Sequence, residues 1–102
     1  MKYQLIVSDA AVRDMTNHIA FLANVSKPAA RKTKDRIMAA LRSLEEMPHR
    51  FPFLEEDELP KNKYHKMYVE KWYLVLYQIR DDTVYVDYIL DCRQDYQWLL
   101  RP

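Results

Sequence analysis

The chain has 102 residues, with 16 Lys and Arg against 15 Asp and Glu for a formal charge of +1, 49% apolar residues and no glycine. A chain of this length and apolar content folds as one small domain with a hydrophobic core, which excludes an intrinsically disordered protein. Because Walker and dinucleotide-binding loops need glycine where the backbone approaches a phosphate, the missing glycine excludes nucleotide binding through either motif.

A short strand followed by a helix is predicted at the start of the chain. Tyr3, Leu5 and Val7 alternate with other residues, which is the period of a strand that ends at Ser8. Ser8 or Asp9 then caps a helix whose apolar residues recur at three- and four-residue spacing. The residues of this stripe are Val12, Met15, Ile19 and Leu22.

A second helix is predicted from the capping residue Ser26 and from Pro28 in the first turn. It has apolar residues at 30, 37, 41 and 44 on one face and ends before Pro48. Because about three residues separate the two helices, they should pack as an antiparallel hairpin whose apolar face needs a sheet. The basic residues on the outer side favour a solvated face, with an anionic partner as the alternative. They are Arg31, Lys32, Lys34 and Arg36.

The rest of the chain is predicted to be a loop followed by three strands. Residues 47–63 contain three of the five prolines and an acidic run, which indicates a loop. Aromatic and β-branched residues then dominate the segments 64–69, 72–79 and 84–90. The middle segment is apolar on both faces, which places it at the centre of the sheet. Residues 93–100 are predicted to form a short helix.

Together these elements predict a single α+β domain over residues 1–102. The order is β-α-α-β-β-β with a short helical tail, and a two-helix hairpin packs on one face of a four-stranded, mostly antiparallel sheet. The other face is left free to be concave and to bind another molecule. Because the chain lacks glycine, the turns are expected to use Asp, Asn, Ser and Pro.

The cysteine content and the first residues of the chain bear on its location. Cys92 is the one cysteine, so it forms neither an internal disulfide nor a zinc site, and we expect a cytoplasmic protein without metal or cofactor. Residues 1–7 lack the apolar run of a signal peptide. No segment approaches the roughly 18 apolar residues of a membrane span.

The strand region has a specific order of features. A basic, tyrosine-led strand at 63–69 is followed by a strand at 72–79 that ends in an aliphatic-Tyr-polar-aliphatic pattern, an acidic turn at 80–83, and a final strand that leads into Arg93-Gln94-Asp95. Ser8-Asp9-Ala10-Ala11 at the start of the first helix supports the same pattern. In order and spacing, these features resemble the RelE/ParE superfamily of bacterial toxins from type II toxin–antitoxin modules.

The resemblance implies a toxin that inhibits growth through a macromolecular target. RelE-like members cut messenger RNA in the ribosome, whereas ParE-like members block DNA gyrase and cut nothing. A cognate antitoxin is implied as partner, with Trp72 and Trp98 as its anchoring points and with operator DNA contacted through the antitoxin alone. The alternative is a non-toxic relic that only binds its antitoxin.

Metal-free RNA cleavage needs a base for the 2′-hydroxyl, an acid for the leaving oxygen and cations for the phosphate. The resemblance leaves His65, Lys66 and Arg93 for these roles. The residues expected to bind nucleic acid or another target are Lys61, Lys63, Lys71 and Tyr96.

Two observations oppose cleavage. Met67, Leu74 and Leu100 stand where RelE-like nucleases have polar residues, which favours gyrase inhibition or a relic. On an alternating strand, His65 and Lys66 also point to opposite faces. The simpler interpretation of His65 is an ordinary surface or hydrogen-bonded histidine.

Overall fold

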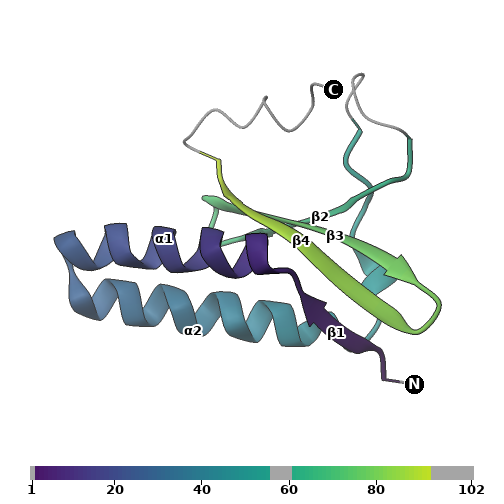
Figure 1. The fold of residues 1–102 in the computed structure, drawn as a ribbon, viewed down its shortest axis with the longest axis horizontal. Coiled ribbons are helices and arrows are strands. Elements are labelled where there is room, and N and C mark those ends of the chain that lie inside the picture. The colour runs from purple at the N-terminus through teal and green to yellow at the C-terminus, as the bar shows by residue number, and fades with distance from the viewer. Residues whose placement is uncertain (1, 56–60, 93–102) are drawn as a thin grey trace.

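In the computed structural model, which describes residues 2–55 and 61–92, two helices cover one face of a four-stranded sheet (Figure 1). The elements are β1 (Gln4–Val7), α1 (Asp9–Val25), α2 (Lys27–Ser43), a short 3₁₀ helix (Pro48–Arg50), β2 (His65–Val69), β3 (Tyr73–Arg80) and β4 (Thr83–Asp91). The predicted α+β fold is therefore confirmed, while the predicted helix at 93–100 lies outside the described residues.

The sheet has the strand order β1-β4-β3-β2. β1 runs parallel to β4, and the other two pairings are antiparallel, as expected for a mostly antiparallel sheet. β3 lies inside the sheet, and both of its faces are buried along most of its length. This confirms the central position that its uninterrupted apolar sequence predicts.

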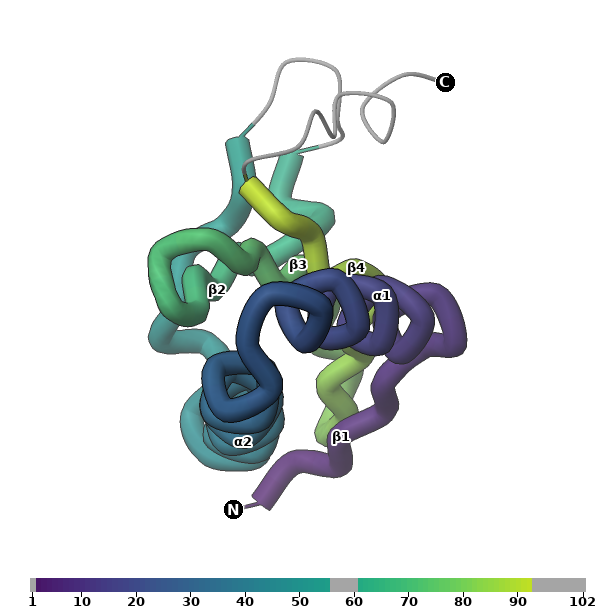
Figure 2. Tube along the Cα trace, turned by 90° about the vertical axis from the view of Figure 1, so that its left-hand side faces the viewer, coloured from purple at the N-terminus to yellow at the C-terminus, as the bar shows by residue number. Residues whose placement is uncertain are grey.

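Serine caps begin both helices where the sequence predicts them. The Ser8 hydroxyl accepts a hydrogen bond from the Ala11 amide at 3.0 Å, and the Ser26 hydroxyl accepts one from the Ala29 amide at 3.2 Å. Figure 2 looks along the helices, which lie side by side. Among the described residues, no helix is long and apolar enough to span a membrane.

The core lies between the helix pair and the sheet. α2 contributes Ile37 and Leu41, which pack with buried residues of β3 and β4 such as Val75 and Val86. In α1 the fully buried residue is Ala11, whereas Val12 is 43% exposed. The predicted apolar stripe of α1 is thus wrong at Val12.

Contacts with β4 explain the orientation of α1. The His18 Nε2–H donates to the Ile89 carbonyl at 2.8 Å, and the Asp14 carboxylate accepts from the Ile89 amide at 3.2 Å. These bonds turn the face of α1 that contains positions 11, 14 and 18 toward the sheet, and Val12 lies outside that face. Burial raises the pKa of Asp14 above its usual value.

Several turns of this glycine-free chain place residues other than glycine in the left-handed region of the backbone. Asn62 and Asp81 have positive φ values, as expected for Asn and Asp. Met47, Glu70 and Lys71 also have φ between 49° and 67°, so the prediction that turns rely on Asp, Asn, Ser and Pro is wrong at these three positions. Glu70 and Lys71 are consecutive, in the connection between β2 and β3.

Candidate functional site

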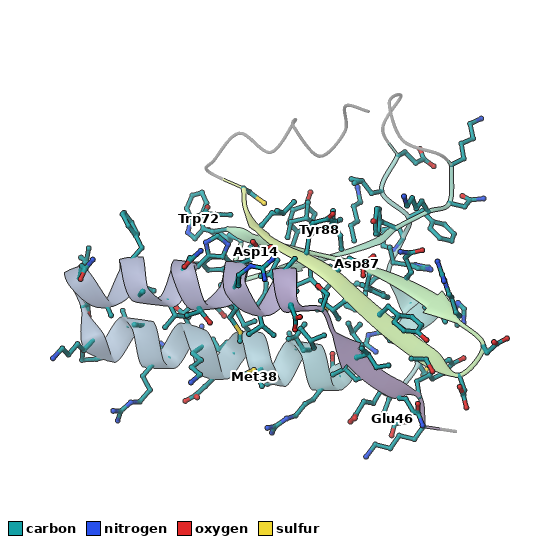
Figure 3. The ribbon with its side chains drawn as sticks, in the orientation of Figure 1. Asp14, Met38, Glu46, Trp72, Asp87 and Tyr88 are labelled. Carbon is teal, nitrogen blue, oxygen red and sulfur yellow. The ribbon has the colours of Figure 1, made fainter. Side chains whose placement is uncertain are left out.

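The face of the sheet turned away from the helices, called the open face here, is the candidate functional surface. In β3 it carries Leu74 and Leu76, because alternate residues of a strand point to opposite faces. β2 sets Lys66 opposite Leu76 and Tyr68 opposite Leu74, so both side chains belong to the open face. Figure 3 shows the side chain of Tyr88 on this side, away from α1 and α2.

The centre of the open face is apolar and is covered by the segment that precedes β2. Leu74 has 0% exposure, and Leu76 and Leu90 are also buried. These leucines pack with Leu54 and Tyr64 in one cluster. The Leu54 amide donates a hydrogen bond to the Tyr64 carbonyl at 2.7 Å, which holds the cover in place. The expectation of a wholly free face is therefore wrong at its centre.

A β-bulge in β4 sets Asp87 apart from the regular pairing. Leu76 pairs with Tyr88 and Tyr77 pairs with Val86, so Asp87 is the extra residue between them. Bulges redirect neighbouring side chains and are frequent beside functional sites. Here the bulge brings the carboxylate of Asp87 and the ring of Tyr88 next to each other on β4 (Figure 3).

Asp87 lies at the centre of a small polar cluster on the open face. Its carboxylate accepts a hydrogen bond from Gln78 Nε2 at 2.7 Å and lies near the Tyr64 hydroxyl. Burial, with the charge of Asp87, raises the pKa of Tyr64 to about 12, so the phenol stays protonated at neutral pH. The rings of Tyr64 and Tyr88 pack edge to face, with their centroids 6.2 Å apart. Because Tyr64 is buried, the half-buried ring of Tyr88 is the aromatic surface that this pair leaves accessible.

Cations lie against the aromatic rings around this cluster. Lys63 Nζ is 5.3 Å from the ring centre of Tyr64, and the Arg80 guanidinium is 5.9 Å from that of Tyr85. Among the lysines predicted to bind the target, Lys63 therefore belongs to the open face. Lys71 follows β2, whereas Lys63 precedes it, so about 16 Å of strand separates them. The predicted lysines do not form one patch.

His65 lies on the helix side of the sheet, away from Lys66. Its side chain is 6% exposed, and its Nδ1–H donates to the Phe51 carbonyl at 2.8 Å. The rings of Phe53 and Tyr77 lie on it, with centroids 4.1 Å and 5.2 Å away. The alternative that His65 is a hydrogen-bonded histidine fits this environment, while a surface position does not. The structure does not bring His65 and Lys66 together.

Of the remaining predicted site residues, two are exposed and three lie outside the described residues. Trp72 is 48% exposed at the end of the β2–β3 connection, and Lys61 is exposed on the segment before β2. Arg93, Tyr96 and Trp98 lie outside the described residues. Their predicted roles in catalysis, target binding and antitoxin binding therefore remain predictions.

Met67 and Leu74, which stand where the resemblance predicts polar residues of a nuclease, are both buried. Leu74 lies under Leu54 at the centre of the open face, where a nuclease arginine would be expected from the resemblance. Met67 is 3% exposed and faces the helices with the core. A phosphate clamp at either position would need a charged side chain in an apolar environment, which is costly without a partner.

Sequence reasoning missed three residues of the open face. Gln78, Asp87 and Tyr88 were not predicted as site residues, and the hydrogen bond between Gln78 and Asp87 joins β3 to β4. One signal was present in the sequence, because Asp87 interrupts a strand of aromatic and β-branched residues. The bulge that positions this carboxylate is defined by the register of β3 and β4, which the sequence does not show.

Comparisons with known proteins agree with this architecture. The family model described as the ParE toxin of the type II toxin–antitoxin system parDE matches residues 5–96. A solved structure described as a chromosomal ParDE TA system from P. aeruginosa is similar in fold, with a TM-score of 0.73 and 13% sequence identity. The match covers 88% of this chain and 96% of that chain. No curated protein matches the sequence.

Proposed function

This chain belongs to the ParE toxin family of type II toxin–antitoxin systems, and from that premise we propose that it inhibits growth by binding DNA gyrase without cleaving RNA. A toxin that acts by binding needs a stable surface and no arrangement of acid, base and phosphate clamp. The accessible part of the open face, with the exposed Tyr68 and the half-buried Asp87 and Tyr88, is the surface that we assign to the target.

The separation of His65 from Lys66 carries this proposal. Phosphoryl transfer needs its acid, base and cations within hydrogen-bond reach of one substrate. His65 is enclosed on the helix side, whereas Lys66 lies on the open face opposite the buried Leu76. Loss of a single charge-stabilising donor costs a hydrolase about 2.7–4 kcal/mol of barrier, or a factor of about 100 to 1000 in rate. Binding to gyrase requires none of these groups.

One observation favours messenger RNA cleavage as a second candidate. Lys63 and Lys66 both lie toward the open face, where a ribosome-bound transcript would meet aromatic rings and cations. In this alternative Arg93 clamps the phosphate and Tyr96 donates a hydrogen bond, while Lys61 and Lys71 contribute charge at the two ends of β2. In this alternative His65 can reach the substrate only if its hydrogen bond to Phe51 breaks.

A cognate antitoxin is the second partner in the proposal. We place its anchoring contacts at Trp72, whose ring is half-exposed, and at Trp98, because large aromatic side chains supply most of the energy of such interfaces. The antitoxin supplies the base-specific operator contacts, and the complex acts in the cytoplasm. The chain and its genomic neighbour should elute as one complex after co-expression, and separate elution at micromolar concentration would contradict this part.

Induction of the chain alone in a bacterium tests the proposed target. We expect arrested growth, relaxed plasmid DNA and an SOS response, with transcripts of full length. Transcripts cut within codons, together with normal supercoiling, would favour ribosomal cleavage instead. Normal growth at confirmed expression would identify the chain as a relic that only binds its antitoxin.

A further inference from the structure

The first part of α2, residues 27–36, has a strong net positive charge. Five cations and one carboxylate lie between residues 27 and 36, for a net charge of +4. Because the whole chain carries +1, all the other residues together carry −3. The basic residues, called the α2 basic face here, are Lys27, Arg31, Lys32, Lys34 and Arg36.

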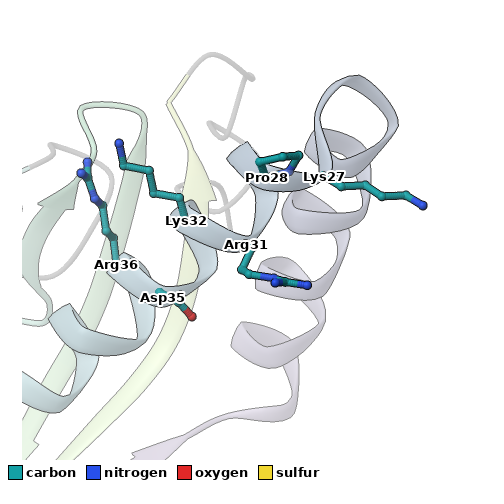
Figure 4. A pocket seen from close by; sticks show the side chains of 6 residues that line it. All are labelled: Lys27, Pro28, Arg31, Lys32, Asp35 and Arg36. Carbon is teal, nitrogen blue, oxygen red and sulfur yellow. The ribbon is translucent and has the colours of Figure 1, made fainter.

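The α2 basic face is exposed along its whole length. Arg36 forms an ion pair with Glu70 at 2.7 Å, and the other four cations form no ion pair with any residue in the described ranges. Figure 4 shows Lys27, Arg31 and Lys32 extending outward from the helix. With Pro28, Asp35 and Arg36, these side chains line a surface hollow of about 600 Å³.

The fold itself does not require this charge. The residues that α2 buries in the core include Ile37 and Leu41, whereas the side chains of the α2 basic face are all exposed. Spacings of four and three residues place Lys27, Arg31 and Lys34 on one side of the helix, over about 10 Å of its length. Each strand of duplex DNA has a phosphate about every 3.4 Å along the duplex axis, so a row laid parallel to that axis spans about three phosphates.

The composition of the α2 basic face distinguishes among anionic partners. A protein partner would need apolar or aromatic anchors, and residues 27–36 contain no aromatic residue, with Pro28 the one apolar residue in the lining of the hollow. Single-stranded nucleic acid would need rings on which bases stack. The phosphate backbone of a duplex needs cations alone.

We therefore propose that the α2 basic face binds the phosphate backbone of duplex DNA without reading its sequence. The contact is additional to the operator contacts assigned to the antitoxin, which read bases. It uses a helix face on the other side of the molecule from the open face, and it does not depend on whether the toxic target is gyrase or the ribosome.

Fluorescence anisotropy of the full-length chain with labelled 20-base-pair duplexes tests the proposal. Four free cations predict a slope of about −3 to −4 in a plot of log K against log salt, between 20 and 150 mM NaCl. Two duplexes of unrelated sequence should bind equally. The double variant Arg31→Gln/Lys34→Gln should weaken binding to both and reduce the magnitude of the slope by about 2.

The matched control is Lys2→Gln/Arg13→Gln, which removes the same charge from exposed positions outside α2. It should retain most of the binding and of the slope, and circular dichroism should show both variants folded. Equal losses in the two double variants would overturn the proposal, since the effect would then follow net charge alone. Tighter binding of polyglutamate than of duplex DNA would also overturn it, in favour of an acidic protein partner.

Discussion

At the scale of single residues, the buried hydroxyl of Tyr77 joins β3 to the segment after α2. Tyr77 has 0% exposure, and its hydroxyl donates to the Pro48 carbonyl at 2.6 Å. The ring also stacks on His65, whose own hydrogen bond reaches Phe51 in the same segment. His65 of β2 and Tyr77 of β3, which pair across the two strands, thus hold residues 48–51 against the core.

Removal of the Tyr77 hydroxyl should destabilise the fold measurably. Tyr77→Phe leaves the buried Pro48 carbonyl without its donor, at a cost of about 1–2 kcal/mol in the free energy of unfolding. Tyr85→Phe is the matched control, because Tyr85 is only half-buried. Urea denaturation of both variants measures the difference, and an equal effect of the two substitutions would contradict the role given to this hydrogen bond.

The same residue should make stability fall at high pH. Burial raises the pKa of Tyr77 to about 12, above its value of about 10 in the unfolded chain. A raised folded-state pKa gives stability that is complete below pH 10 and is lost as the pH rises toward 12. The gap in unfolding free energy between the natural chain and Tyr77→Phe should therefore narrow between pH 9 and 11.5. A constant gap over that range would show that Tyr77 titrates normally.

At the scale of elements, the connection between β2 and β3 is under backbone strain. Glu70 and Lys71 have φ values of 55° and 67°, which suit glycine and are unfavourable for residues with a Cβ atom. Arg36 of α2 donates to both carboxylate oxygens of Glu70, at 2.8 and 2.7 Å. This charge-assisted contact, made by the single nitrogen Nη1, ties the strained connection to α2 and favours its observed conformation.

Relief of this strain should stabilise the protein. Lys71→Gly removes the Cβ atom at a left-handed position and should raise the free energy of unfolding by about 0.5–1 kcal/mol. Lys71→Ala removes the same charge but keeps the Cβ atom, so it should leave stability nearly unchanged. Thermal denaturation of the two variants side by side measures this. A destabilised Lys71→Gly variant would contradict the account of the turn.

The elements that local signals define were predicted closely, and the site was predicted less well. Ser8 and Ser26 cap their helices as expected, because a capping serine acts through an amide three residues away. The alternation of β2 also predicts that His65 and Lys66 face opposite ways. Which one faces inward depends on how β2 pairs and on residues 51–54, which contact it from outside the strand. No local signal contains that information.

At the scale of the whole molecule, two surfaces with different chemistry lie on different layers. The accessible part of the open face carries Tyr68, Asp87 and Tyr88. The α2 basic face carries cations and no aromatic residue. A protein target and a DNA phosphate backbone can therefore be contacted at the same time. This arrangement suits a toxin whose proposed target, gyrase, works on duplex DNA.

Assays with purified components distinguish a chain that binds gyrase from one that cuts RNA. The chain is added to a gyrase supercoiling reaction and, separately, to ribosomes translating a defined messenger RNA. We expect supercoiling to fall with increasing chain concentration while the message stays at full length. Cleavage of the message with undiminished supercoiling would instead show that the chain is a nuclease that leaves gyrase unaffected.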